Sequence, residues 1–138
     1  MYLNLLNEKE KELFLEMAFF LSNCDQDFAE SEKQMIDEYR REMSMTEERY
    51  QIRKLPLEDS LKNLRDSSQL TKNAMFLELL ALAKCDKNFG SNEQELIATI
   101  RDSFCVSEDK YNESLKWVDD MQKLYAKSHR IVNDQVSM

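Results

Sequence analysis

The sequence contains little glycine and proline: Gly90 and Pro56 are the single residues of each type among 138. Strand-rich folds need many tight turns, and turns depend on these residues, so a β-rich fold is excluded. The abundant Leu, Glu, Lys, Met and Ala are instead strong helix formers. We therefore predict an all-α fold, a single compact domain of about seven helices over residues 1–138.

Long apolar runs are also missing. The two densest runs, Leu13–Leu21 and Ala74–Ala83, each contain a glutamate and fall short of the about 18–20 apolar residues of a membrane span. The first residues lack the charged start and long apolar run of a secretory signal. Three cysteines, an odd number, do not suggest a disulfide framework. These absences predict no membrane insertion and a cytoplasmic location.

Basic charge is scarce, with 19 Lys and Arg against 27 Asp and Glu, a net charge of −8. Because phosphates would be repelled, we expect no nucleic-acid partner. A zinc site is not indicated, since Cys24, Cys85, Cys105 and the single His129 form no CxxC or CxxH pair. We expect the three thiols to be buried and reduced. No motif indicates an enzyme, and we expect a protein partner.

The two halves of the chain repeat each other at a shift of 61 residues without a gap. The segment LSNCDQDFAESE (21–32) returns as LAKCDKNFGSNE (82–93), and Arg40 and Tyr50 fall on Arg101 and Tyr111. We predict an internal duplication with repeat units of about 8–54 and 69–130, followed by a tail at 131–138. The predicted helices are about 8–24, 30–44, 46–54, 57–67, 69–85, 91–104 and 108–130.

Local signals place the helix starts and the core. Asn7 and Glu10 resemble a capping box, and Thr46 and Ser107 are predicted N-caps. The helices at 8–24 and 69–85 are apolar nearly all round, which is typical of central helices. We expect these two to pack side by side, with the other helices around them.

The repeated segment permits two interpretations. In one, Asp25 and Asp86 accept hydrogen bonds from loop N–H groups near a helix end. In the other, the acidic side chains bind a divalent cation, because hard oxygen ligands suit calcium, magnesium or manganese. An EF-hand is excluded, since its sixth and twelfth positions would be Glu30 and Ile36. The candidate ligands are Asp25, Asp27, Glu32, Asp86, Asn88 and Glu93.

The last predicted helix is a candidate binding surface. It carries Trp117, Val118, Met121, Leu124 and Tyr125, and some of these must face the core. If Trp117 and Met121 do not, they form a candidate partner groove.

The repeated segment, its duplication and the helical layout resemble the TerB-like family, named for a tellurite-resistance protein, over residues 8–125. The family pattern falls on Cys24, Asp25, Phe28 and Glu32, and again on Cys85, Asp86, Phe89 and Glu93. The glycine that follows the aspartate in the family is Gln26 or Lys87 here, and its serine cap is Ala29 or Gly90. The resemblance implies a non-enzymatic cytoplasmic interaction module of a chemical-stress response. It also implies divalent-cation binding, and peripheral membrane association through a partner.

Overall fold

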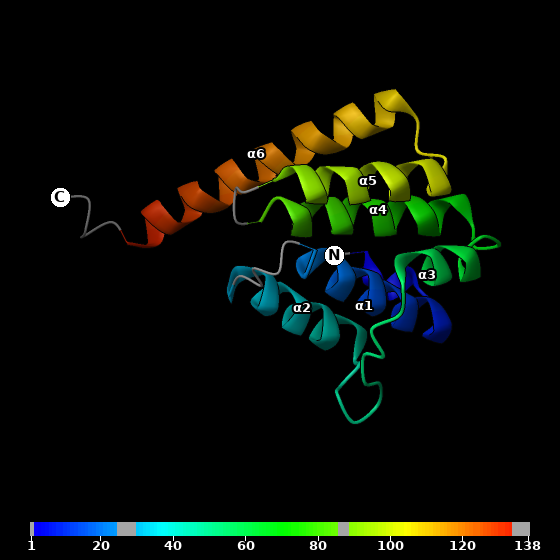
Figure 1. The fold of residues 1–138 in the computed structure, drawn as a ribbon. Helices are drawn as coiled ribbons and strands as arrows, with labels where there is room; N and C mark the ends of the chain where they lie inside the picture. Colours follow the sequence, from blue (N-terminus) through cyan, green and yellow to red (C-terminus); the bar gives the residue numbers. More distant parts are fainter. Residues whose placement is uncertain (1, 25–29, 86–88, 134–138) are drawn as a thin grey trace. The chain divides into compact units, whose positions relative to one another are not determined.

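The computed structural model describes residues 2–24, 30–85 and 89–133, except the side chains of residues 31 and 32. Within these ranges all regular structure is helical, which confirms the predicted all-α fold. A short 3₁₀ helix η1 (Leu3–Leu5) precedes six α-helices (Figure 1). Their bounds are α1 (Glu8–Ser22), α2 (Glu30–Met43), α3 (Leu57–Asn63), α4 (Gln69–Ala83), α5 (Ser91–Phe104) and α6 (Glu108–Val132). No helix in the described ranges is both long and apolar enough to cross a membrane.

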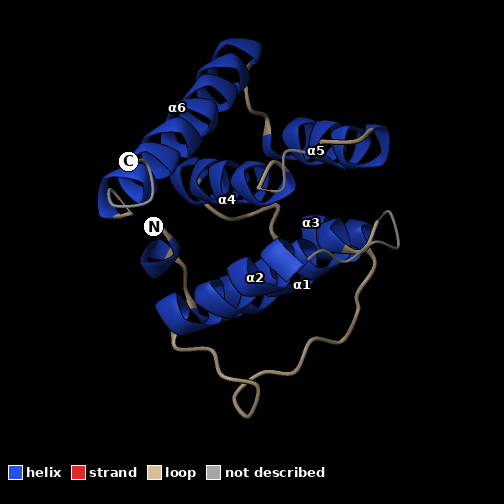
Figure 2. Cartoon of the chain, turned by 90° about the vertical axis from the view of Figure 1, so that its left-hand side faces the viewer, coloured by secondary structure: helices blue, strands red, loops and turns tan. Residues whose placement is uncertain are grey.

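The chain divides into two units, residues 1–106 and residues 107–138. In the first unit, α1 contacts α2, α3 and α4, and α4 also contacts α5. Helices α4 and α5 form one layer and α1, α2 and α3 another (Figures 1 and 2). The expected side-by-side packing of the two most apolar helices, α1 and α4, is therefore confirmed.

The core of the first unit is built from the apolar faces of these helices. Phe14 on α1 and Phe76 on α4 are fully buried, and the Phe14 ring meets Tyr39 edge-on at a centroid distance of 5.0 Å. Such edge-to-face pairs contribute about 0.5–1.5 kcal/mol beyond the burial of their area. The inward face of α2 includes Ile36 and Met43, which are both buried.

The duplication is visible in the backbone. The bounds of α1 and α4, and those of α2 and α5, differ by 61 residues at both ends. Both copies begin α1 or α4 with a side-chain cap: Asn7 accepts from the N–H of Glu10, and Ser68 accepts from the N–H of Thr71. The first of these caps is the predicted capping box. The same local sequence signals therefore start the same helices in both halves.

The two copies also end α2 and α5 in the same way. Ser44 and Cys105 follow these helices with φ of 56° and 55°, in the left-handed region. The residue after each of these positions accepts a hydrogen bond from an arginine side chain. Arg40 donates to the carbonyl of Met45, and Arg101 donates to the carbonyl of Val106, both at 3.0 Å. The left-handed residue turns the chain, and the arginine satisfies a carbonyl outside the helix.

The predicted helix at 46–54 is wrong. Thr46 starts only a single turn, in which its carbonyl accepts the N–H of Tyr50 at 3.0 Å. Beyond this turn the chain has no regular secondary structure as far as Pro56. Two local features oppose a helix there: Lys54 has a left-handed φ of 60°, and proline disfavours helical backbone in the residue before it. We call residues 44–56 the α2–α3 connection.

The second unit consists of α6, one continuous helix of 25 residues. Ser107 caps it as predicted, because its side chain accepts the N–H of Lys110 at 3.2 Å. Glu108 and Asp109 lie in the first turn and Arg130 in the last, an arrangement that the helix dipole favours. The helix continues to Val132, so the tail predicted at 131–138 is wrong for Ile131 and Val132, and residues 134–138 lie outside the described residues.

Candidate functional site

The predicted cation ligands lie mostly outside the described residues. This holds for Asp25 and Asp27 in the first copy, for Asp86 and Asn88 in the second, and for the side chain of Glu32. Glu93 is described: it lies in the first turn of α5 and is buried. In the ranges that the structure covers, no group of three or more His, Cys, Asp or Glu could hold a metal ion. Cation binding by the two acidic segments therefore stays a prediction.

The helix ends next to these segments are described. The chain leaves α1 with the N–H of Cys24 donating to the carbonyl of Leu21 at 3.4 Å. The equivalent N–H of Cys85 donates to Leu82 at 3.2 Å. Gly90 is the N-cap residue of α5. Because glycine has no side chain, no side-chain hydrogen bond caps this helix. The two copies therefore approach the acidic segments with the same backbone geometry.

The prediction that all three thiols are buried is wrong, most clearly for Cys105. All three cysteines are thiols rather than disulfides, and Cys24 and Cys85 are half-buried. Cys105 is exposed, because it occupies the left-handed position after α5, where the chain turns out of the helix.

A buried carboxylate with several hydrogen bonds lies on α1, at a position that no sequence motif had indicated. Glu16 on α1 is only 1 % exposed. Its Oε2 accepts the hydroxyl of Tyr50 and the N–H of Arg53, the latter at 2.6 Å, and its Oε1 accepts the N–H of Leu55 at 2.9 Å. A buried charge is tolerated when it is hydrogen-bonded in this way. These contacts hold the α2–α3 connection onto α1 and give the two N–H groups acceptors that a helix would otherwise supply.

Tyr50 and Arg53, which both donate to Glu16, also interact with each other. The side chain Nε of Arg53 donates to the hydroxyl of Tyr50 at 3.3 Å, and its guanidinium lies 5.9 Å from the Tyr50 ring centroid. Burial and the hydrogen bond to Glu16 raise the pKa of Tyr50, while Arg53 opposes the shift. Since all three donors are directed to Glu16 from the protein itself, the arrangement is a structural one.

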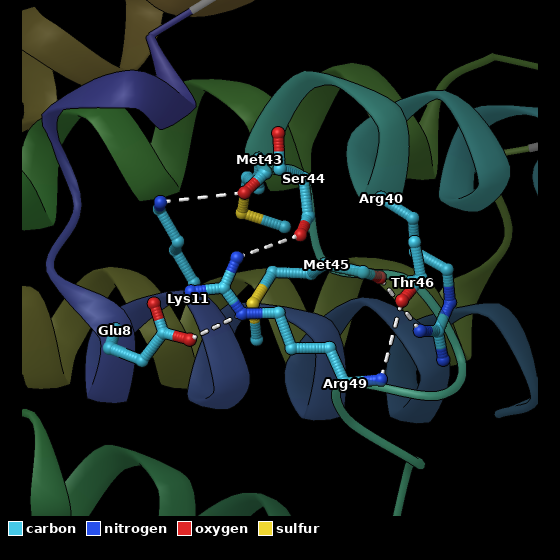
Figure 3. Close-up of polar contacts among 8 residues, drawn as sticks. All are labelled: Glu8, Lys11, Arg40, Met43, Ser44, Met45, Thr46 and Arg49. Carbon is cyan, nitrogen blue, oxygen red and sulfur yellow. Dashed lines mark hydrogen bonds and ion pairs between the residues drawn. The ribbon is translucent and has the colours of Figure 1, made fainter.

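The start of the connection is fixed by basic side chains that donate to carbonyls (Figure 3). Lys11 on α1 donates to the carbonyl of Met43 at 3.4 Å, and Arg49 donates to that of Ser44 at 3.2 Å. Arg49 also forms an ion pair with Glu8 at 3.0 Å. Arg40 reaches both ends of the turn, because it donates to the carbonyls of Met45 and Tyr50, each at 3.0 Å. The connection is therefore anchored at several points.

A surface of a different kind lies on the second half of α6. Four large apolar side chains are 66–75 % exposed there: Leu124, Tyr125, Ile131 and Val132. We call these four residues the α6 stripe. In the described chain, most other large apolar side chains are buried or half-buried, apart from a few such as Leu70, which is 64 % exposed. Four in nine residues on one helix therefore stand out from the scattered exposed apolar residues that are normal for a protein surface.

The partner groove predicted at Trp117 and Met121 stays a prediction. Both of these residues are half-buried and Val118 is buried, whereas the exposed large apolar residues of α6 begin at Leu124. Ile131 and Val132 both fell in the tail predicted at 131–138. One signal could have found them: apolar pairs recur at seven-residue intervals, at 117–118, 124–125 and 131–132.

Comparison with protein-family models, with curated proteins and with solved structures finds no match to this chain.

Proposed function

We propose that this chain is a non-enzymatic interaction module that binds a partner protein through the α6 stripe. One observation carries the proposal: Leu124, Tyr125, Ile131 and Val132 are 66–75 % exposed, as two apolar pairs about two turns apart on one helix. Exposed apolar groups cost free energy in water, about 25 cal/mol per Å², which a bound partner would recover. Of the four, Tyr125 belongs to a residue type that is enriched among the anchors of binding surfaces.

The TerB-like resemblance extends the proposal to a cytoplasmic role in a chemical-stress response. It rests on the repeated segments at 21–32 and 82–93 and on the duplicated helices that flank them. The stripe lies outside those segments. The binding surface and the stress role are therefore supported by separate features of the chain.

The binding proposal can be tested by crosslinking and reconstitution. A photo-crosslinking residue at position 125 or 132 should capture a partner in the native cells, and the purified partner should then bind the purified chain. The double variant Leu124→Ser, Ile131→Ser should weaken that binding by at least about tenfold, since each buried leucine or isoleucine contributes ~1.5–3 kcal/mol. Leu70→Ser is the matched control, because Leu70 is equally exposed but lies on α4.

Two results would contradict the proposal: a partner whose affinity is the same for the double variant and the wild type, or no crosslink at either position. The stress role has its own test. In a strain that lacks the chain, the wild type and Leu70→Ser should restore growth on tellurite, and the double variant should not. If the double variant also restores growth, the stripe does not serve that role.

A further inference from the structure

The α6 stripe has the spacing of a helix-pairing seam. Apolar pairs occur at Trp117–Val118, Leu124–Tyr125 and Ile131–Val132. A seven-residue interval returns a side chain to nearly the same side of an α-helix, with a drift of only about 20°. The last two pairs are exposed, so α6 presents a narrow apolar seam over its final turns. Apolar residues that recur every seven positions on one side of a helix form part of the heptad pattern by which helices pack against one another.

The charged residues on this part of α6 all have one sign. Residues 121–133 contain Lys123, Lys127 and Arg130 and no Asp or Glu, although the whole chain has a net charge of −8. Lys127 follows Leu124 by three residues and precedes Ile131 by four, so it borders the seam. A partner surface that carries carboxylates opposite Lys127 would therefore be favoured, and one that carries lysines would be repelled.

Two other occupants fit these observations less well. A second copy that paired through the same stripe would bring two basic segments together, which costs free energy. An anionic membrane would attract basic residues around the seam, but at 3.6 residues per turn Lys123 and Arg130 lie on the side of α6 away from it. Residues 1–106 contain fourteen basic and twenty-one acidic residues, and their net charge of −7 would be repelled by such a membrane.

We propose that the α6 stripe binds an amphipathic α-helix of a partner protein, with apolar residues at heptad spacing and Asp or Glu beside them. This inference rests on the proposed function, which requires only that a partner protein binds the stripe. Helix-on-helix docking of this kind uses anchors at i, i+3, i+4 and i+7. The partner helix would place its apolar seam on Leu124 and Ile131 and a carboxylate near Lys127.

The test uses the full chain and synthetic helical peptides of three heptads. One peptide has Leu at the a and d positions and Glu at e and g. A second has Lys in place of Glu, and a third has the composition of the first in a scrambled order. Binding is measured by fluorescence anisotropy at low and physiological salt. We expect the Glu peptide to bind at least about tenfold more tightly than the Lys peptide, and this preference to shrink with salt.

Two variants separate the seam from the charge. The double variant Leu124→Ser, Ile131→Ser should bind the Glu peptide about tenfold more weakly or worse than the wild type. Leu70→Ser should bind it with unchanged affinity. Lys127→Glu should lower the affinity for the Glu peptide and raise the affinity for the Lys peptide. Equal binding of the Glu and Lys peptides, equal binding of the scrambled peptide, or no peptide binding would each overturn the inference.

Binding of a membrane or of a second copy of this chain would be detected by separate measurements. Leu124-dependent binding to phosphatidylserine vesicles without peptide binding would favour the membrane and overturn the inference. So would Leu124-dependent dimerisation in analytical ultracentrifugation. The proposed function fails separately, on the crosslinking and reconstitution experiment above. If the natural partner requires Leu124 and Ile131 but contacts them with something other than an acidic amphipathic helix, the inference fails and the proposed function stands.

Discussion

The hydroxyl of Tyr50 donates a hydrogen bond to the carboxylate of Glu16, which lies 34 residues earlier in the chain. This contact joins the α2–α3 connection to the middle of α1. The same carboxylate accepts the N–H groups of Arg53 and Leu55. One buried side chain thereby determines the path of a segment that local signals had predicted to be helical.

Replacing Glu16 with glutamine should destabilise the protein. The glutamine amide has the same size as the carboxylate, but one of its two positions is an NH₂ donor. In one orientation this NH₂ group faces the N–H of Leu55, and in the other it faces the donors of Tyr50 and Arg53, so a hydrogen bond of Glu16 is lost in either case. We expect the free energy of unfolding to fall by about 1–3 kcal/mol, measured by urea denaturation. The amide protons of Arg53 and Leu55 should also exchange faster. Glu12→Gln, one turn earlier on α1 and half-exposed, is the control, with an expected change within about 0.5 kcal/mol. Equal losses for both variants would contradict this role of Glu16.

Tyr39 should make the protein sensitive to alkaline pH. Burial, and then the nearby Glu78, raise the pKa of the Tyr39 hydroxyl well above its ordinary value of about 10. A raised pKa in the folded state contributes stability that is complete below pH ~10 and is lost as the pH rises through the folded pKa. Stability should therefore fall above pH ~10, in part because of Tyr39.

The variant Tyr39→Phe separates this effect from the hydrogen bond. It loses the bond from the hydroxyl to the carbonyl of Glu78 (3.1 Å), so it should be about 1 kcal/mol less stable at pH 7. Its stability should then decrease less than that of the wild type between pH 9 and 11, measured by denaturant unfolding at each pH. Tyr2→Phe, at an exposed site, is the control. Parallel pH profiles for Tyr39→Phe and the wild type would refute the assignment.

Glycine should stabilise the two left-handed positions that end α2 and α5. Ser44 and Cys105 have φ of 56° and 55°, a conformation that costs a residue with a Cβ about 1–2 kcal/mol. Glycine removes that cost but loses more entropy on folding, about 0.5–1 kcal/mol. We therefore expect Ser44→Gly and Cys105→Gly each to raise the free energy of unfolding by about 0.5–1 kcal/mol. Ser103→Gly, inside α5, should lower it by a similar amount in the same denaturation experiment. A loss of stability in all three variants would argue against strain at these positions.

Thermal unfolding can test the predicted cation sites. If Asp25 and Asp86 are ligands, millimolar calcium, magnesium or manganese should raise the melting temperature of the metal-stripped protein by several degrees, because binding stabilises the folded state. Asp25→Asn and Asp86→Asn should abolish that shift. Under the structural interpretation the same variants would lose about 1 kcal/mol but show no dependence on metal. Only the metal dependence therefore separates the two interpretations.

The sequence by itself determined the duplicated helix pairs, α1 with α2 and α4 with α5. The capping side chains Asn7, Ser68 and Ser107 are local signals, and each marks the start of a helix that the structure contains. The apolar surfaces of α1 and α4 likewise predicted that these two helices would be central and adjacent. Such features are predictable because capping and periodicity depend on residues within a few positions of one another.

Only the tertiary structure decided the rest. Thr46 and the acids after it resemble the Ser107 start, yet Ser107 begins a helix of 25 residues while Thr46 begins one turn. Pro56 disfavours a helix through Leu55, and in addition Glu16, distant in sequence, accepts the N–H groups of Arg53 and Leu55, a competition that no local propensity encodes. The same limit applies to α6. Its apolar spacing is present in the sequence, but only the folded chain shows that Val118 is buried and Tyr125 exposed, because burial depends on contacts between residues far apart in the chain.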